Sequence, residues 1–155
     1  MQTTRRSFLR SSAAAGAVLG LAPQVLFSRD GVPPSEQVHV GLIGCRNKGF
    51  EILEFHLRHG GVRCAALCDV DRNVLEEKAA AVEKLTGEKP ALYGDYRRLL
   101  EHKGIDAVII GTPDHWHCLP LVHACEAGLD VYVEKPLAIS LDECNRMVRA
   151  TRRHK

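Results

Sequence analysis

The chain has no surplus of positive charge outside its N-terminal stretch. Residues 1–37 contain four arginines and two acidic residues, so the whole formal net charge of +2 lies there and residues 38–155 are balanced. Nucleic-acid-binding proteins cluster lysine and arginine to neutralise phosphates. We therefore expect no nucleic-acid partner and no docking to an anionic membrane surface, which leaves small molecules or proteins as partners.

Long hydrophobic runs are missing as well. The apolar run Ser11–Leu21 is too short to span a bilayer, and no later segment approaches that length. We expect no transmembrane span after the N-terminal leader. The sequence also has no internal repeat and no low-complexity tract, so its 155 residues leave room for one domain.

The N-terminal stretch has the form of an export signal. A cationic start, in which Arg5-Arg6 precedes Phe8-Leu9, is followed by an Ala/Gly/Leu-rich run. This resembles the twin-arginine signal, which sends folded proteins across the bacterial inner membrane. We predict a signal over residues 1–28, a linker over residues 29–37, and a periplasmic or exported location.

Two points about this leader stay open. Gly20-Leu21-Ala22 is the nearest small-x-small cleavage site, but Pro23 follows it directly, so the leader is either cut elsewhere or kept as an anchor. The alternative is a basic, disordered N-terminus beside an ordinary apolar helix. That alternative does not explain the arginine pair and the weak hydrophobicity together.

Six cysteines in a small exported protein would ordinarily suggest a disulfide framework. Here they lie inside apolar periodic segments, so we expect buried free thiols. A protein that folds in the reducing cytoplasm before export needs no disulfides. The cysteine usage therefore agrees with the predicted leader.

From Val38 onward, short apolar runs alternate with helical patterns. This alternation predicts an α/β fold, a Rossmann-type doubly wound parallel sheet, over residues 38–155. Strands are predicted at 38–43, 62–68, 91–93, 106–111 and 130–134, and helices at 49–58, 71–86, 95–101, 116–127 and 140–155. Because such a sheet normally has six strands, we expect this domain to be truncated before its last strand and before a C-terminal α/β domain.

The first predicted strand is followed by a glycine turn, Gly44-Cys45-Arg46-Asn47-Lys48-Gly49. It has the first and third glycines of the dinucleotide fingerprint G-x-G-x-x-G, with Arg46 in the middle place. A turn of this kind at a helix N-terminus can hold a pyrophosphate on free amides, to which Arg46 would add a guanidinium. The alternative is a glycine turn that serves packing alone.

Asp69 ends the second predicted strand, 25 residues after Gly44. An acid there accepts hydrogen bonds from the adenosine ribose hydroxyls and repels a 2′-phosphate, which favours NAD over NADP. Arg72 is close enough in sequence to soften that preference. The alternative is that Asp69 or Asp71 only caps the following helix.

Four potential metal ligands follow the fourth strand: Asp114, His115, His117 and Cys118. With Trp116 and His117 already inside the next predicted helix, this spacing does not direct the four side chains to one centre. We therefore expect no metal. His117 is expected at the helix start, where it faces the cleft or acts as a cap.

The motifs at the strand ends, taken together, resemble the glucose-fructose oxidoreductase, inositol dehydrogenase and MocA-like (Gfo/Idh/MocA) family. The resemblance covers Val38 to the end of the chain. It is carried by the glycine turn, by Asp95-Tyr96-Arg97-x-Leu99-Leu100, by Thr112-Pro113-Asp114-x-x-His117, and by Glu134-Lys135-Pro136.

The resemblance implies a role for each motif. Gly44, Arg46, Asn47 and Gly49 would hold the pyrophosphate of NAD, Asp69 the adenosine ribose, and Thr112, Pro113, His117 and Glu134 the nicotinamide side. Lys135 would be the catalytic residue, because its ammonium can bond a substrate hydroxyl and stabilise the developing alkoxide. The alternative is a solvated strand-end lysine paired with Glu134.

Two departures limit the transfer of roles. Arg46 replaces the middle glycine, and the resemblance implies a general base in a C-terminal domain that we expect this chain to lack. The expected function is hydride transfer from a sugar-like or cyclitol-like alcohol by a full-length homo-oligomer. The alternatives are an NAD-dependent glycosidase of the same family and a stand-alone, non-catalytic dinucleotide-binding or interaction domain.

Overall fold

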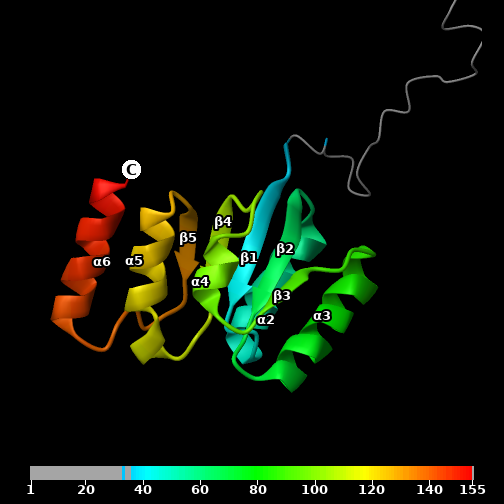
Figure 1. Cartoon of the computed structure of the whole chain (residues 1–155), viewed down its shortest axis with the longest axis horizontal. Helices are drawn as coiled ribbons and strands as arrows, with labels where there is room; N and C mark the ends of the chain where they lie inside the picture. The colour runs from blue at the N-terminus through cyan, green and yellow to red at the C-terminus, as the bar shows by residue number, and fades with distance from the viewer. Residues whose placement is uncertain (1–32, 34–35, 155) are drawn as a thin grey trace, which may run out of the picture. The chain divides into compact units, whose positions relative to one another are not determined.

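The computed structural model describes Pro33 and residues 36–154 (Figure 1). The predicted signal over residues 1–28, and with it the twin-arginine pair, lies outside the described residues. In the described part, no helix is long and apolar enough to cross a membrane.

Five parallel strands form one sheet in the order β3-β2-β1-β4-β5. This order matches the first five places of the doubly wound nucleotide-binding sheet, so the predicted fold class is confirmed. The strands are β1 (Val38–Ile43), β2 (Val62–Cys68), β3 (Ala91–Tyr93), β4 (Ala107–Ile110) and β5 (Asp130–Val133).

The helices follow the predicted pattern, with local stop and start signals at their ends. Asp71 caps one helix by accepting hydrogen bonds from two backbone amides, and Gly87 ends the same helix in a left-handed conformation. Ser140 caps the last helix through the amide of Glu143. The helices are α2 (Asn47–His59), α3 (Arg72–Thr86), α4 (Tyr96–Leu100), α5 (Cys118–Glu126) and α6 (Leu141–Arg153).

The segment after β4 differs from the prediction. Asp114–Trp116 form a 3-10 turn, η2, and α5 begins only at Cys118. The predicted helix start at Trp116 was therefore wrong. Pro113 fixes the backbone at the start of η2, and the Trp116 amide donates to its carbonyl at 2.8 Å, which closes a tighter turn than an α-helix.

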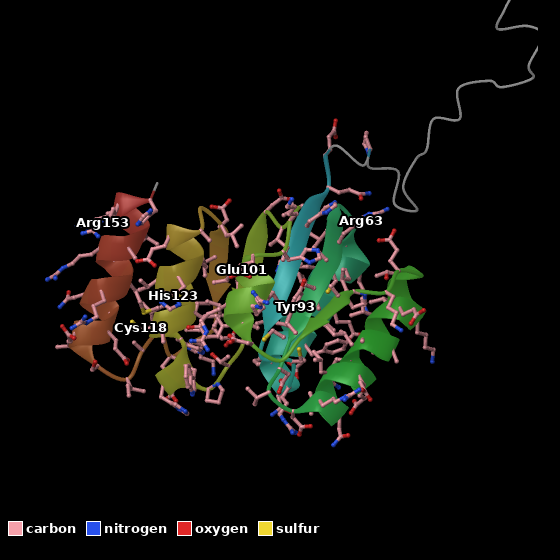
Figure 2. All side chains as sticks on the ribbon, in the orientation of Figure 1. Arg63, Tyr93, Glu101, Cys118, His123 and Arg153 are labelled. Carbon is pink, nitrogen blue, oxygen red and sulfur yellow. The ribbon has the colours of Figure 1, made fainter. Side chains whose placement is uncertain are left out.

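Two hydrophobic cores cover the two faces of the sheet. Leu42, Leu53 and Val82 belong to the core under α2 and α3, whereas Val108, Ile110 and Leu121 belong to the core under α4 and α5. Helix α6 packs beside α5, and Cys118 lies on α5 where its thiol donates to the Glu143 carbonyl at 3.7 Å (Figures 1 and 2). Side chains along β4 alternate between the two cores, because Ile109 belongs to the core under α2 and α3 whereas Val108 and Ile110 belong to the other, as a sheet covered on both faces requires.

The cysteines are free thiols, as the sequence predicted. Five of them are buried and Cys144 is partly exposed. Burial raises the pKa of Cys64 to about 12, and burial together with the nearby carboxylates of Asp69 and Asp95 raises the pKa of Cys68 to about 12. Burial also raises the pKa of Cys45 strongly.

These thiols predict a loss of stability in alkaline solution. A thiol whose pKa is raised on folding stabilises the fold fully below its ordinary value of 9.0, and loses that contribution as pH rises toward about 12. Between pH 9 and pH 10.5, each such thiol should lower the free energy of unfolding by up to about 2 kcal/mol. Urea unfolding at both pH values measures this loss. The variant Cys64→Ala should lose less stability over the same interval, and an identical loss in both proteins would contradict the prediction.

Candidate functional site

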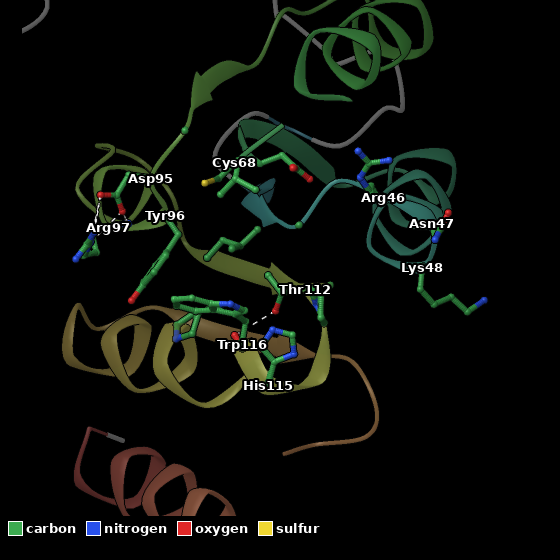
Figure 3. A pocket seen from close by; sticks show the side chains of 18 residues that line it. Arg46, Asn47, Lys48, Cys68, Asp95, Tyr96, Arg97, Thr112, His115 and Trp116 are labelled. Atoms are coloured by element: carbon green, nitrogen blue, oxygen red, sulfur yellow. Dashed lines mark hydrogen bonds and ion pairs between the residues drawn. The ribbon is translucent and has the colours of Figure 1, made fainter. Parts of the chain in front are cut away.

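A cavity of about 760 Å³ opens at the carboxyl ends of the strands (Figure 3). Its wall combines the glycine turn after β1, Asp69 after β2, Tyr96 after β3, and Thr112 after β4. In an open parallel sheet, ligands bind at this edge. Where the strand order reverses, the loops after two neighbouring strands lead to opposite faces of the sheet and leave a crevice between them.

The glycine turn brings backbone unusually close to backbone. A Cβ atom on Gly49 would lie 2.2 Å from the Gly44 carbonyl oxygen, and a Cβ atom on Gly111 would lie 2.3 Å from the Gly49 Cα atom. Gly44 has a φ of +87°, a conformation that glycine adopts without steric cost. The first turn of α2 is thereby seated against the end of β4, and the turn both packs the fold and lines the cavity.

The N-terminus of α2 faces the cavity without a side-chain cap. Arg46 occupies the N-cap position but makes no capping hydrogen bond, and the first turn contains no acidic residue. Arg46, Asn47 and Lys48 all line the cavity. Free amides and an uncompensated helix dipole at such a terminus attract an anion.

The side chains of Arg46 and Lys48 already have partners. The Arg46 guanidinium pairs with Asp71, and the Lys48 ammonium donates to Glu51 at 2.6 Å. The hydrogen bond to Glu51 raises the pKa of Lys48, with a smaller effect from Glu134. The backbone of the turn, more than its cations, is therefore available to a phosphate. Asn47 has a φ of +38°, which shows how tightly the chain turns there.

Asp69 and Asp71 have different tasks. Asp71 caps α3, whereas Asp69 accepts hydrogen bonds from the Cys45 amide (2.8 Å) and the Asp71 amide (2.9 Å). Asp69 is therefore not the helix cap, and its carboxylate fixes the glycine turn to the end of β2. A carboxylate has about four lone-pair positions, so two bonds leave acceptor capacity on the cavity side.

Two aromatic side chains of the wall were not assigned a role from the sequence. Tyr96 stacks on His123 and its hydroxyl lies 3.0 Å from His123 Nδ1, and burial raises the pKa of Tyr96. Trp116 is 46% exposed, and its carbonyl accepts from Thr112 Oγ1 at 3.1 Å (Figure 3). The sequence contains a signal for each residue. Tyr96 belongs to the family motif Asp95-Tyr96-Arg97, and Trp116 lies in the segment that follows a strand end.

The predicted site residues that follow β4 do not all line the cavity. Thr112 and Pro113 line the cavity, whereas His117 is 1% exposed and is not part of the wall. His117 is the N-cap residue of α5, which confirms its predicted place at the helix start, but its side chain makes no capping hydrogen bond. Among the described residues, no group of three or more His, Cys, Asp or Glu side chains is arranged to hold a metal ion.

The end of β5 also lies outside the cavity wall. Glu134 is partly buried and Lys135 is exposed. The Lys135 amide donates to Glu134 Oε2 at 3.2 Å, but no ion pair forms between the two side chains in the part of the chain that the structure describes. Lys135 is thus not neutralised by its neighbour. The electrostatic effect of Glu134 on Lys48 shows that this strand end lies within range of the glycine turn.

Residues 38–155 match the Gfo/Idh/MocA family, described as an oxidoreductase family with an NAD-binding Rossmann fold. The chain belongs to this family. The resemblance that the strand-end motifs suggested is therefore confirmed at the level of the family and of its nucleotide-binding domain.

Three similar proteins illustrate the range of the family. Glycosyl hydrolase family 109 protein 1 of Shewanella sp. (strain ANA-3) is 36% identical over 125 residues, which are 78% of this chain and 27% of that protein. The WlbA dehydrogenase from Chromobacterium violaceum, solved with NADH and UDP-GlcNAcA, is 30% identical with a TM-score of 0.64, over 77% of this chain and 33% of the other. The myo-inositol 2-dehydrogenase from Lactobacillus plantarum is 29% identical with a TM-score of 0.63, over 76% and 34%.

The chain spans about a quarter to two fifths of the length of the curated relatives that it matches. The similarity therefore concerns one domain of those proteins.

Proposed function

We propose that this domain binds NAD in the cavity at the strand ends, and that the protein to which it belongs oxidises a sugar-like or cyclitol-like alcohol by hydride transfer. The main support for the proposal is that one cavity is lined by two groups that are complementary to two parts of NAD. The uncapped N-terminus of α2 supplies positive potential for a pyrophosphate, and Asp69 supplies acceptors for a ribose.

The glycine turn places the N-terminus of α2 for such a cofactor. Gly44 and Gly49 hold the turn where any side chain would collide with backbone, and this close packing seats the N-terminus of α2 against the strand ends that line the cavity. The carboxylate of Asp69 favours a free ribose hydroxyl over a 2′-phosphate, which supports NAD over NADP. Bound NAD would supply the hydride acceptor, and the chain's own residues would bind and orient it.

Lys135 is the proposed catalytic residue. Its ammonium is exposed and makes no ion pair in the described part of the chain, so it is free to bond a substrate hydroxyl. As that hydroxyl loses its proton, a fixed positive charge stabilises the alkoxide oxygen. The base that takes the proton is proposed to lie in a C-terminal domain, and the full-length protein is proposed to be a homo-oligomer.

The single tryptophan of the chain offers a direct test of binding. Because Trp116 lines the cavity and is 46% exposed, saturating NAD or NADH should quench its fluorescence. A titration of the 155-residue chain gives the dissociation constant for each cofactor, and we expect NAD to bind more tightly than NADP. The variant Trp116→Phe should lose the signal while calorimetry still detects binding. Absence of binding by both methods in the wild-type chain would contradict the proposal.

A second candidate is an NAD-dependent glycosidase, which would use transient oxidation to eliminate a glycosidic substituent. It is favoured by the 36% identity to a protein named as a glycosyl hydrolase. The full-length protein distinguishes the two candidates. Net NADH formation from free sugars or cyclitols supports the dehydrogenase, whereas release of a leaving group from an aryl glycoside without net NADH supports the glycosidase.

We further propose that residues 1–28 direct twin-arginine export to the periplasm. The arginine pair before Phe8-Leu9 and the weakly apolar run support this proposal. Residues 1–37 fused to a reporter should export it, and the double change Arg5→Lys plus Arg6→Lys should abolish export. Cell fractionation measures the outcome, and export that persists in the double variant would refute the proposal.

A further inference from the structure

His117 is the most deeply buried polar side chain of the described residues, with 1% exposure. Its ring lies between two segments that are distant in sequence. Nε2 is 2.8 Å from the Thr112 carbonyl oxygen, and Nδ1 is 2.8 Å from the Pro136 carbonyl oxygen. The cavity wall includes Thr112 but not His117 itself.

The backbone of His117 is anchored independently of its ring. Its amide donates to the Asp114 carbonyl at 3.1 Å, and its carbonyl accepts from the Leu121 amide at 3.3 Å. The residue thus stands at the junction of η2 and α5, and the ring projects from a fixed point. Carbonyl oxygens only accept and a neutral imidazole carries one N–H, so in the Nδ1–H tautomer the ring donates to the Pro136 carbonyl.

The two segments that the ring joins are the two sides of the proposed reaction site. Thr112 belongs to the turn after β4, on the cavity wall, and Pro136 directly follows Lys135. The side chain of Lys135 has no ion pair in the described part of the chain to fix its position. The position of the Lys135 ammonium therefore depends on the backbone contacts of the segment that follows β5.

We propose that His117 is a positioning residue, which ties the Lys135–Pro136 segment to the turn after β4 and so holds the lysine beside the cofactor. The tie itself is a property of this chain, whereas its consequence for Lys135 rests on the proposed function. This role differs from the direct contact with the nicotinamide that the family resemblance implies for His117.

Hydrogen exchange on the 155-residue chain tests the tie. The amides of Glu134 and Ile139 flank the segment, and both are hydrogen-bonded, to the Ile110 carbonyl and to Glu143 Oε2. In His117→Phe, which fills the space without an N–H, both amides should exchange on the order of tenfold faster, while amides of α3 keep their rates. His117→Gln keeps a donor and should restore part of the protection.

His123→Phe is the matched control, because His123 lies on α5, the helix that His117 precedes, and its ring contacts the Tyr96 hydroxyl instead. It should leave the exchange of Glu134 and Ile139 unchanged. Unchanged exchange in His117→Phe, or equal acceleration in both variants, would overturn the tie.

A second measurement tests the consequence for Lys135. Saturating NADH should protect the Lys135 ammonium of the wild-type chain from an amine-acylating reagent, as read by mass spectrometry. In His117→Phe this protection should be lost while NADH still quenches Trp116. If NADH fails to bind the wild-type chain, the proposed function is wrong and exchange alone decides the tie. If NADH binds and His117→Phe keeps full protection of Lys135, the positioning role is wrong.

Discussion

Replacing Gly49 with alanine should lower the free energy of unfolding by up to about 2 kcal/mol and abolish dinucleotide binding. The added Cβ atom would lie 2.2 Å from the Gly44 carbonyl oxygen, which is backbone and cannot move aside as a side chain could. Overpacking of this kind costs about 1–3 kcal/mol or more. Alanine gains about 1 kcal/mol over glycine inside a helix, so the clash must outweigh that gain to produce the expected loss.

Two further glycine variants make the result interpretable. Gly111→Ala tests the same contact from the β4 side, without the helix term, because its Cβ atom would lie 2.3 Å from the Gly49 Cα atom. Gly94→Ala is the control for stability alone, since a Cβ atom there meets nothing within 4 Å and the residue does not have a left-handed backbone, although Gly94 itself lines the cavity. Urea unfolding measures stability and Trp116 fluorescence measures binding. Wild-type stability in Gly49→Ala would show that α2 is not seated as described.

Replacing Asp69 with alanine should weaken NAD binding about a hundredfold and remove the preference for NAD over NADP. The change removes the proposed ribose acceptor and also leaves the amides of Cys45 and Asp71 without their carboxylate partner. A hydrogen bond to a charged group contributes about 1.5–3 kcal/mol, and each 1.4 kcal/mol is tenfold in affinity. Titration of both cofactors against the wild-type chain and the variant measures the two effects.

Asp142→Ala is the matched control for this experiment. It removes the same charge from the exposed surface of α6, where the carboxylate pairs with Arg146, and it should leave both affinities unchanged. Urea unfolding of Asp69→Ala shows whether the variant is still folded, so that weaker binding can be assigned to the glycine turn and not to unfolding of the domain. A retained preference for NAD in a folded Asp69→Ala chain would assign discrimination to another residue.

The sequence by itself determined the order of elements and the family. Apolar runs that are buried on both faces of a parallel sheet, such as Ala107–Ile110, are recognisable because no polar residue interrupts them. Helix ends were also predictable at Asp71 and Gly87, because capping depends on residues close in sequence. The glycine turn and Asp69 could be predicted to line one cavity, because the carboxyl ends of parallel strands meet at one edge of the sheet.

Only the tertiary structure decided what the individual side chains do. Whether Asp69 caps a helix or fixes the glycine turn depends on the Cys45 amide, which reaches it across neighbouring strands. The ion pair of Arg46 with Asp71 likewise spans two elements, and no local rule places these residues together. His117 was expected at the cleft or as a cap, yet its ring lies between Thr112 and Pro136. Local chemistry decides where elements begin and end, whereas the partners of a side chain are set by packing between elements that are distant in sequence.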